Sequence, residues 1–392
     1  MDIYNRALQK HEEWQGKIEI VSRVPVKNKE DLSLSYTPGV AQPCLEIEKN
    51  KDMSYIYTRR FNTVAVITNG SAVLGLGDIG ASASMPVMEG KCVLFKEFAG
   101  IDAYPISINS KDPKEIIKTV KLLEQNFGGI NLEDIAAPSC FEIEKELINQ
   151  CEIPVFHDDQ HGTAIVCAAA LINSLKITKK SFNEIKIVIN GAGAAGISIV
   201  NFLLLFNPLD IVVCDKDGII NKNNINGLNS AQKEIANKTN RFEIKGNLAD
   251  ALKGADVFIG VSAPNLVTDE MVKSMSSKSI VFAMANPTPE IMPNEAIKAG
   301  AFIVGSGRSD FANQINNVLA FPGIFKGALA VRAKKISTGM KISAAKALAD
   351  FIPYKKLKQD YILPAPFEEG IAEKIAQAVA KTAIEENLAR LL

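Results

Sequence analysis

The chain has 392 residues, of which 47% are hydrophobic and 22% are charged, and its 44 basic and 44 acidic side chains give a formal net charge of zero. A chain of this size and composition folds into two or three globular domains, and the absence of basic tracts argues against nucleic acid or an anionic membrane as a partner. The N-terminus carries no basic and apolar leader, and no apolar run approaches the roughly 20 residues that a membrane span needs. The sequence therefore predicts a cytoplasmic protein.

The first part of the chain begins with helical patterns over residues 1–60. A turn interrupts them at Ser35-Tyr36-Thr37-Pro38-Gly39, where Pro38 forces an extended conformation on the residue before it and so places Tyr36 in a loop. Short apolar runs then alternate with helical periodicity. The predicted strands are residues 63–68, 103–108, 129–132 and 153–156, and the predicted helices are residues 112–126 and 138–149.

A second series of alternating strand and helix patterns starts at Ile185 and predicts a parallel sheet with right-handed crossover helices. The last residues, 368–392, are helical again and should pack back on the first domain or on a subunit partner. We therefore expect two α/β domains, one of residues 1–157 with residues 318–392 and one of residues 158–317. The strands of the second series are expected at residues 185–189, 211–214, 257–261, 280–283 and 302–304.

A glycine-rich loop follows the first strand of the second series and opens a helix. It reads Gly191-Ala192-Gly193-Ala194-Ala195-Gly196, a pattern whose glycines allow a tight turn and let a pyrophosphate approach the helix N-terminus. Asp215 ends the next strand, near the spacing expected of the carboxylate that accepts the ribose hydroxyls. Its charge disfavours a 2'-phosphate and so favours NAD, although Lys216 beside it leaves NADP open. These features predict a Rossmann-like domain that binds NAD or NADP.

A second match to the same glycine pattern lies in the first domain, at Gly75-Leu76-Gly77-Asp78-Ile79-Gly80. Glu97 even follows it at about the distance expected of the ribose-binding acid. Pro86, however, falls where the crossover helix should run, and proline breaks a helix interior. We therefore interpret this loop as a structural or substrate-side turn and not as the nucleotide site.

Two pairs of adjacent acids follow two strands of the first series. Glu133-Asp134 and Asp158-Asp159 would lie along one edge of one parallel sheet, where open α/β sheets place their ligands. Carboxylates so close repel each other unless they are protonated or neutralised by a cation. Solvated acids at strand ends explain either pair alone, whereas the two pairs together favour a site for Mg²⁺ or Mn²⁺, which prefer oxygen ligands.

The second acid pair lies between His157 and His161. This spacing resembles the zinc motif H-E-x-x-H, which requires both histidines on one face of a helix. A strand pattern leads into the stretch and Gly162 follows it, so we expect the histidines to support the loop and not to bind zinc. Taken alone, Lys91 and Tyr36 are unremarkable, as a lysine with a solvated head and a packed tyrosine.

Seven segments of the chain form an ordered set of motifs. They are Ser-Tyr-Thr-Pro-Gly-Val-Ala from Ser35, Gly-Leu-Gly-Asp-Ile-Gly from Gly75, Glu-Gly-Lys from Glu89, Glu-Asp-Ile-Ala-Ala-Pro from Glu133, His-Asp-Asp-Gln-His-Gly-Thr from His157, Asn-Pro-Thr-Pro-Glu from Asn286 and Asn-Asn-Val-Leu-Ala-Phe-Pro-Gly from Asn316. With these motifs in register, the chain resembles the malic enzyme family in its short prokaryotic form from about residue 20 to its end. For this form we expect no phosphotransacetylase-like extension after residue 392.

The resemblance implies the divalent-metal-dependent oxidative decarboxylation of (S)-malate to pyruvate and CO₂ with reduction of NAD(P)⁺, and decarboxylation of oxaloacetate as well. Residues 158–317 would then be the NAD(P)-binding domain, and residues 1–157 with 318–392 the catalytic, metal-binding domain. A homodimer is expected, because the family forms oligomers and the N-terminal helices carry more apolar surface than one helix layer buries. Two alternatives stay open, another metal-dependent 2-hydroxy acid dehydrogenase and a catalytically inactive nucleotide-binding regulator.

The resemblance also implies a role for each site residue. Lys91 is implied as the general base that takes the proton of the malate C2 hydroxyl, which requires a lowered lysine pKa, and Tyr36 as the acid that protonates the enolate. Asp158 would support Lys91. The implied metal ligands are Glu133, Asp134 and Asp159, the implied substrate-side residues near the nicotinamide are Asn286 and Asn317, and the nucleotide site comprises Gly191, Gly193, Ala194, Ala195, Gly196, Asp215 and Asn286.

The chain departs from longer eukaryotic relatives at one position of the site. Those relatives place an arginine just before the Gly-Leu-Gly loop to hold a malate carboxylate, and this chain has Gly70-Ser71-Ala72-Val73 instead. The sequence therefore leaves recognition of that carboxylate unassigned, with Ser71 and the asparagines as candidates.

Overall fold

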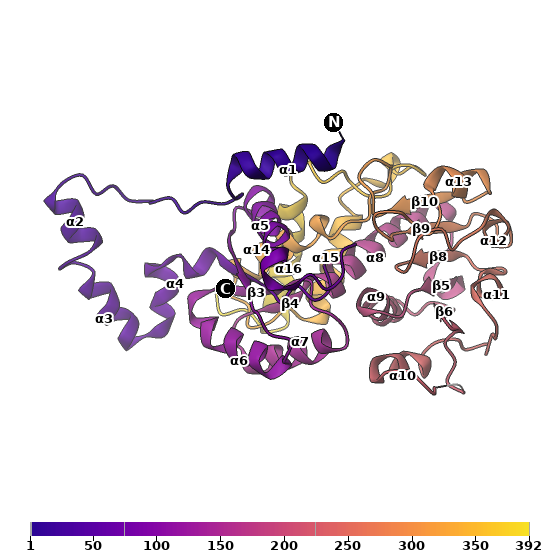
Figure 1. Ribbon diagram of the computed structural model, residues 1–392, viewed down its shortest axis with the longest axis horizontal. Coiled ribbons are helices and arrows are strands. Elements are labelled where there is room, and N and C mark those ends of the chain that lie inside the picture. The colour runs from indigo at the N-terminus through magenta and orange to yellow at the C-terminus, as the bar shows by residue number, and fades with distance from the viewer. Residues whose placement is uncertain (1, 74, 224, 392) are drawn as a thin grey trace.

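The computed structural model describes residues 2–73, 75–223 and 225–391 of the chain. Two sheets lie side by side, each between layers of helices, and an N-terminal arm extends from the first of them (Figure 1). This architecture confirms the α/β fold class, with a Rossmann-like sheet in the second half of the chain.

The first sheet contains four parallel strands in the order β2-β1-β3-β4. Its central strand β1 is buried along its whole length, as expected where helices cover both faces of a parallel sheet. All four predicted strands are confirmed, with ends displaced by at most two residues. The strands are β1 (Thr63–Thr68), β2 (Asp102–Ser107), β3 (Gly129–Leu132) and β4 (Val155–His157).

Helices cover both faces of this sheet. On one face lie α5 (Gly80–Ala99) and α14 (Phe321–Ala330), which meet where the Phe95 ring makes edge contacts with the Phe321 and Phe325 rings. The other face is covered by α6 (Pro113–Leu123) and α7 (Ser139–Gln150). Because α14 comes from the last part of the chain, the C-terminal segment completes this layer.

Helix α5 runs through Pro86, so the expectation that this proline interrupts the helix is wrong. Proline cannot donate to the carbonyl four residues earlier, at Ser82, but both residues lie on the exposed face of α5, where water satisfies that carbonyl. The ammonium of Lys17 donates to the Pro86 carbonyl at 2.6 Å. The position of Pro86 therefore does not help to decide which glycine loop binds the nucleotide.

The second sheet has the order β10-β9-β8-β5-β6-β7, and all neighbouring strands are parallel except β6 and β7. The five predicted strands are confirmed, with ends displaced by at most two residues, whereas β7 is too short to show a period and was not predicted. The elements are β5 (Lys186–Asn190), β6 (Asp210–Asp215), β7 (Gly218–Ile219), β8 (Val257–Gly260), β9 (Ile280–Ala283) and β10 (Ile303–Ser306), with α8 (Asp158–Thr178), α9 (Ala194–Leu204) and α10 (Ser230–Ala236) on one face and α11 (Leu248–Leu252), α12 (Asp269–Lys273) and α13 (Pro293–Lys298) on the other.

Helix α8 joins the two sheets. Its 21 residues are long and apolar enough to cross a membrane by length and composition, so the expectation that no apolar run approaches this length is wrong. Its most apolar window is 72% buried inside the protein, between α9 and α15 (Thr338–Ala349), as in the core helix of a folded domain. The buried side-chain nitrogen of Asn173 donates to the carbonyls of Ala349 and Ile362 at 2.9 Å each, which ties α8 to the C-terminal segment.

The C-terminal helices α14, α15 and α16 (Ile371–Glu385) pack on one another, and α14 and α16 also contact α5 of the first domain. One hydrophobic core therefore runs from the first sheet through α8 and these helices to the second sheet. This packing supports the division into residues 1–157 with 318–392 and residues 158–317, which stays a prediction.

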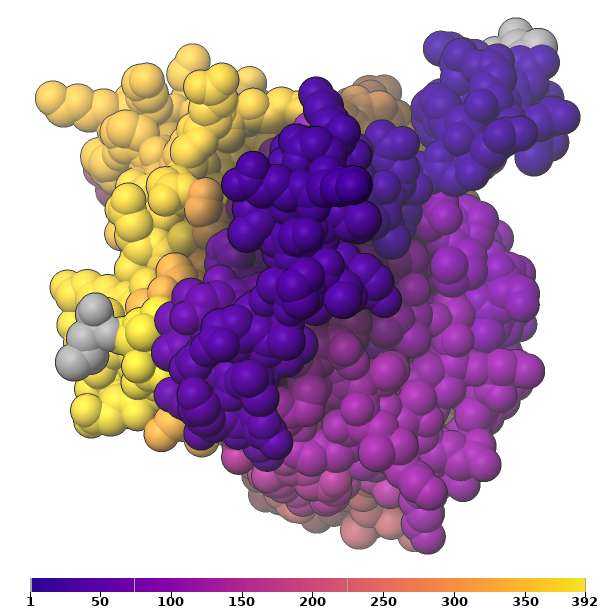
Figure 2. Space-filling model, turned by 90° about the vertical axis from the view of Figure 1, so that its left-hand side faces the viewer, coloured from indigo at the N-terminus to yellow at the C-terminus, as the bar shows by residue number. Residues whose placement is uncertain are grey.

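The N-terminal segments project from the body of the molecule. Helices α2 (Lys29–Ser35) and α3 (Ala41–Lys49) contain no buried residue and form an arm at the far left of Figure 1, and Figure 2 shows the same indigo segments standing out from the face of the molecule. Ile20 and Leu34 in this arm are 87% and 72% exposed. Apolar exposure on this scale marks an interaction surface.

The remaining helical elements are α1 (Ile3–Trp14), α4 (Ser54–Tyr57), η1 (Lys51–Met53), η2 (Arg59–Asn62), η3 (Glu124–Asn126), η4 (Phe182–Glu184), η5 (Asn317–Leu319) and η6 (Tyr354–Lys356).

Candidate active site

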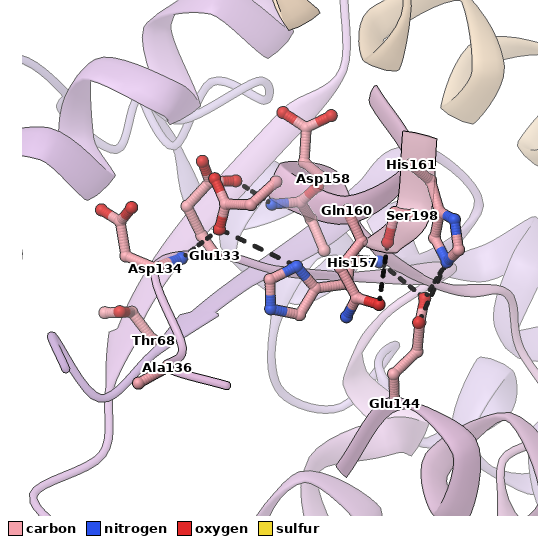
Figure 3. A network of polar contacts seen from close by, with 12 residues as sticks. Thr68, Glu133, Asp134, Ala136, Glu144, His157, Asp158, Gln160, His161 and Ser198 are labelled. Carbon is pink, nitrogen blue, oxygen red and sulfur yellow. Dashed lines mark hydrogen bonds and ion pairs between the residues drawn. The ribbon is translucent and has the colours of Figure 1, made fainter. Parts of the chain in front are cut away.

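The two pairs of acids meet at the carboxyl edge of the first sheet. Strands β3 and β4 pair in parallel with their last residues opposite each other, so the acids that follow them lie at the same level. Carboxylate oxygens of Glu133, Asp134 and Asp159 all lie within 4.8 Å of one another. Asp158 and Asp159 occupy the first turn of α8, where the helix dipole favours negative charge. The acids predicted from two separate strands therefore form one cluster (Figure 3).

Glu133, Asp134 and Asp159 fit a divalent cation. The Oδ2 atom of Asp134 is buried without a hydrogen-bond partner. Burial, together with repulsion among the acids, raises the pKa of Glu133 to about 7, of Asp134 to about 9 and of Asp159 to about 6. A cation among these oxygens would neutralise the repulsion and satisfy the orphaned atom, and oxygen ligands suit Mg²⁺ or Mn²⁺.

Lys91 points into the same cluster from α5. Its ammonium lies 2.5 Å from Oδ2 of Asp158 and 3.0 Å from Oε1 of Glu133, and its side chain is 7% exposed. The ring of Phe321 covers it, with 4.1 Å between Nζ and the ring centroid. Two carboxylates and an aromatic face thus hold the ammonium in one place.

The charges around Lys91 oppose the lowered pKa that a base needs near neutral pH. Burial by itself lowers the pKa of Lys91, but Asp158, Glu133 and Asp159 outweigh burial and raise the pKa above its ordinary value. Burial also raises the pKa of Asp158, to about 7. The pKa of Lys91 is therefore raised, whereas a general base requires a lowered pKa. The expected lowering depends on the positive charge of a bound cation among these acids. A cation that neutralises Glu133 and Asp159 would remove part of the attraction.

The glycine loop at Gly191 joins β5 to α9. Gly191 has a φ of 119°, and a side chain at Gly196 would begin 1.7 Å from the Gly191 carbonyl oxygen, so both positions require glycine. At Gly193, by contrast, the space where a side chain would begin is open for 4 Å. The open space adjoins the free N–H groups of the first turn of α9, which begins at Ala194. The loop therefore leaves room for a phosphate at a helix N-terminus.

The other predicted residues of the nucleotide and substrate sites lie at the sheet edges. Asp215 ends β6, where one of its oxygens accepts the backbone N–H of Asp217 at 2.9 Å. Asn286 follows β9, and its backbone carbonyl oxygen lies 3.8 Å from where a side chain at Gly75 of the first domain would begin, while its side-chain amide lies beside Gly307. Asn317 begins η5, and its Cβ atom lies 2.9 Å from where a side chain at Gly162 would begin, beside the Asp158 carboxylate. Both asparagines thus lie between the first and second domains.

Two residues predicted to act at the site, Tyr36 and Ser71, are not available at the acid cluster. Tyr36 ends α2 in the projecting arm and is 67% exposed, and α2 lies far from β3 and β4 (Figure 1). Ser71 donates to Oδ1 of Asn69 at 2.6 Å and accepts the N–H of Ala136 at 2.9 Å, so its hydroxyl is already used within the loop. The structure therefore does not bring Tyr36 to the acids of its own chain.

Comparisons with known proteins place the chain in a family. The family model described as "Malic enzyme, N-terminal domain" matches residues 15–148, and "Malic enzyme, NAD binding domain" matches residues 160–384. The bifunctional malic/malolactic enzyme of Bacillus subtilis (strain 168) is 55% identical over 391 residues, which cover 100% of this chain and 95% of the relative. The NAD-dependent malic enzyme of Geobacillus stearothermophilus is 52% identical over 375 residues, or 96% of this chain and 78% of the relative. The crystal structure of the NAD-dependent malic enzyme from Thermotoga maritima has a TM-score of 0.93 and 49% identity, over 95% of this chain and 98% of that one.

The chain belongs to the malic enzyme family. Its match over nearly the full length of the Bacillus subtilis relative agrees with the short prokaryotic form. The loop at Gly191 lies within the residues matched by the NAD binding domain, and the loop at Gly75 within those matched by the N-terminal domain. In the loop at Gly75, the Gly70 carbonyl accepts the N–H groups of Ile79 and Gly80, so this segment forms a turn.

The two histidines of this malic enzyme segment lie on different elements. His157 ends β4 and His161 lies in α8, and in the described part of the chain the candidate metal-binding group contains only acids. Nδ1 of His157 is 3.8 Å from Oδ2 of Asp159, beyond hydrogen-bonding distance. Burial lowers the pKa of His157 to about 4, so its ring is neutral at physiological pH.

A buried acid beside this site was missed in the sequence. Glu144 lies on the same face of α7 as the buried Cys140, Ile143 and Leu147. An acid on the apolar stripe of a helix was the available signal, because a buried carboxylate needs specific partners.

Replacing Asp159 with asparagine is expected to raise the Mn²⁺ concentration for half-maximal activity by at least about 10-fold, because the change removes a negative charge from the proposed ligand set. Initial rates across a Mn²⁺ titration measure this. Asp112→Asn is a matched control, since Asp112 caps α6 away from the cluster and asparagine caps a helix equally well. An unchanged Mn²⁺ requirement would remove Asp159 from the proposed ligands.

Proposed function

We propose that this member of the malic enzyme family converts malate to pyruvate and CO₂ with reduction of NAD(P)⁺, and that it also decarboxylates oxaloacetate. The observation that carries the proposal is the ammonium of Lys91, which lies between Asp158 and Glu133 beside three acids that fit a divalent cation. Oxidation and decarboxylation of a 2-hydroxy acid need a base, a hydride acceptor and a means of stabilising negative charge. The acid cluster with Lys91 offers the base and a cation site, and the loop at Gly191 offers a site for the hydride acceptor.

In this proposal Glu133, Asp134 and Asp159 hold Mg²⁺ or Mn²⁺, and the loop at Gly191 holds the nucleotide. When bound, the nucleotide accepts the hydride of malate C2, and the cation polarises the C2 oxygen and stabilises negative charge as CO₂ leaves. Lys91 accepts the proton of the C2 hydroxyl as a general base in its neutral amine form, and a cation held by Glu133 and Asp159 would favour that form by offsetting their negative charge.

Three further residues orient the reactants in this proposal. Asp158 keeps the ammonium of Lys91 in place through its 2.5 Å contact. Asn317 lies beside Asp158 near the start of α8, which supports a position for it beside the substrate. The backbone of Asn286 follows β9 and lies near Gly75 of the first domain, which supports a position for this residue near the nicotinamide and the substrate.

Tyr36 is proposed to deliver the last proton, to C3 of the enol of pyruvate, in the active site of the partner subunit of a homodimer. Its own cluster is out of reach, because Tyr36 lies on the projecting arm. The arm also leaves apolar side chains in water that a second copy would bury, and symmetric exchange would complete both sites. Exchange of arms therefore accounts for both the role of Tyr36 and the predicted homodimer.

Purified protein with malate, Mn²⁺ and NAD⁺ or NADP⁺ should release CO₂ in step with the reduced nucleotide. A folded sample that shows no activity with either nucleotide would contradict the proposal and favour a nucleotide-binding regulator. Equal turnover of 2-hydroxy acids that lack a second carboxylate would favour a different metal-dependent dehydrogenase. The cytoplasmic location predicted from the sequence belongs to the same proposal.

Initial rates are expected to favour NAD⁺ over NADP⁺, because Asp215 ends β6, the strand end at which an acid would accept the ribose hydroxyls and repel a 2'-phosphate. The variant Asp215→Ser should narrow the ratio of the two kcat/KM values by about tenfold, which corresponds to about 1.4 kcal/mol. Asp217→Ser, an exposed acid of the same turn, is the control. If the ratio stays the same in Asp215→Ser, this residue does not select the nucleotide.

A further inference from the structure

Glu144 is a buried acid that the proposed mechanism does not use. It lies on the stripe of α7 that faces the first sheet, and it is 6% exposed. Burying a carboxylate costs free energy unless its oxygens receive hydrogen bonds. The partners that Glu144 finds in the interior therefore indicate what it does there.

Both oxygens of Glu144 contact the segment that carries the aspartates of the active site. Oε1 accepts the backbone N–H of His157 at 3.0 Å, and Oε2 lies 3.0 Å from Nε2 of His161 (Figure 3). His157 is the last residue of β4 and the N-cap of α8, and His161 lies in the fourth position of that helix. Glu144 thus bridges the junction between the strand and the helix.

This junction has no side-chain cap of its own. The side chain of His157 makes no capping hydrogen bond. In a capping box, the third residue of the helix would accept the N–H of the N-cap residue. That third residue here is Gln160, whose side-chain oxygen instead lies 3.5 Å from the hydroxyl of Ser198 on α9. Glu144 supplies from α7 the acceptor that the helix itself does not provide.

The two contacts of Glu144 bracket Asp158 and Asp159 in the chain. Asp158 meets the Lys91 ammonium, and Oδ2 of Asp159 accepts the N–H of Asp134 at 2.8 Å. A shift of the first turn of α8 would therefore move both aspartates relative to their partners. Burial by itself would raise the pKa of Glu144, but His161 and Lys341 outweigh it and lower the pKa to about 2, and an ionised acceptor makes the stronger hydrogen bond.

We propose that Glu144 is a positioning residue of the metal site, which sets where Asp158 meets Lys91 and where Asp159 meets the cation by holding His157 and His161. The proposal rests on the proposed function of the acid cluster. It adds that metal affinity depends on a carboxylate of α7 that touches neither the cation nor the substrate.

The test compares Glu144→Ala and Glu144→Gln with Glu142→Ala, which removes an exposed acid of the same helix. Binding of Mn²⁺ is measured directly by electron paramagnetic resonance, without substrate or nucleotide. In Glu144→Ala we expect Mn²⁺ binding to weaken by about 10–100-fold. Glu144→Gln keeps an oxygen that accepts the His157 N–H and should retain most of the affinity, and Glu142→Ala should equal the parent protein.

Steady-state kinetics separate positioning from a general loss of structure. In Glu144→Ala, kcat should fall and the Mn²⁺ requirement should rise while KM for NAD⁺ stays within about twofold, because the nucleotide loop lies in the other domain. Unchanged Mn²⁺ binding in folded Glu144→Ala, or an equal loss in Glu142→Ala, would overturn the proposal.

If Glu144→Ala does not fold, His161→Ala removes the partner of Oε2 at a partly exposed position. That variant must also weaken Mn²⁺ binding, and unchanged binding would overturn the proposal. A failure of the proposed function is distinguishable, because the parent protein would then bind Mn²⁺ without oxidising malate. The direct binding measurement does not depend on turnover.

Discussion

Replacing Lys91 with alanine is expected to lower kcat for malate by about 10²–10⁴-fold, the range that a positioned general base contributes. The amine of Lys91 is the group proposed to take the proton, and its nitrogen lies between Asp158 and Glu133 beside the ring of Phe321, where alanine has no group that could accept a proton. Binding of NADH should persist within about twofold, because the loop at Gly191 lies in the other domain. Initial rates and NADH fluorescence titration measure the two quantities.

The matched control for Lys91→Ala is Lys96→Ala. Lys96 lies on the same helix, and its exposed ammonium pairs with Asp102 at 2.6 Å, an ion pair of small expected effect. Thermal unfolding checks that both variants remain folded. A loss of NADH binding together with activity in Lys91→Ala would mean that the role assigned to Lys91 is wrong.

A heterodimer of one Lys91→Ala chain and one Tyr36→Ala chain is expected to have about half the activity of the parent dimer, although each variant alone is inactive. If Tyr36 acts in the partner's site, one of the two sites in the heterodimer combines an intact Lys91 with an intact Tyr36. If Tyr36 acts in its own chain, neither site is complete. Co-expression with two affinity tags isolates the heterodimer for this measurement.

The crossed control places both substitutions on one chain and pairs it with a parent chain. Exchange of arms then leaves both sites incomplete, so this heterodimer should be inactive, whereas action within one chain would leave about half the activity. The two heterodimers therefore give opposite results under the two arrangements. An inactive first heterodimer with an active second one would contradict the exchange of arms.

Most strands could be predicted because the buried strands of a parallel sheet are continuous apolar runs between turn signals. β7 could not, since two residues show no period. α5 shows the opposite case, in which the local rule against proline is overridden because Pro86 faces solvent and the rest of the helix packs on the sheet. The expectation that no apolar run approaches the length of a membrane span overlooked α8, whose first turn is acidic and whose apolar residues come after it.

The acids of the site could be predicted because strands of one parallel sheet end at the same edge, which brings Glu133 and Asp134 to Asp159. Nothing local to α5 distinguishes Lys91 from other lysines, and its role came from resemblance alone. The raised pKa of Lys91 could not be foreseen, because it depends on which carboxylates surround the ammonium.

The sequence by itself determined the alternation of strands and helices, the glycine loop at Gly191 and the acids at the strand ends, since these follow from spacing along one segment of chain. Only the tertiary structure decided which distant residues meet. It placed Lys91 on Asp158, 67 residues away, set Glu144 against the start of α8, and carried Tyr36 away from its own site. The physical reason is that local periodicity specifies the backbone of each element, whereas the packing between elements specifies which side chains share a site.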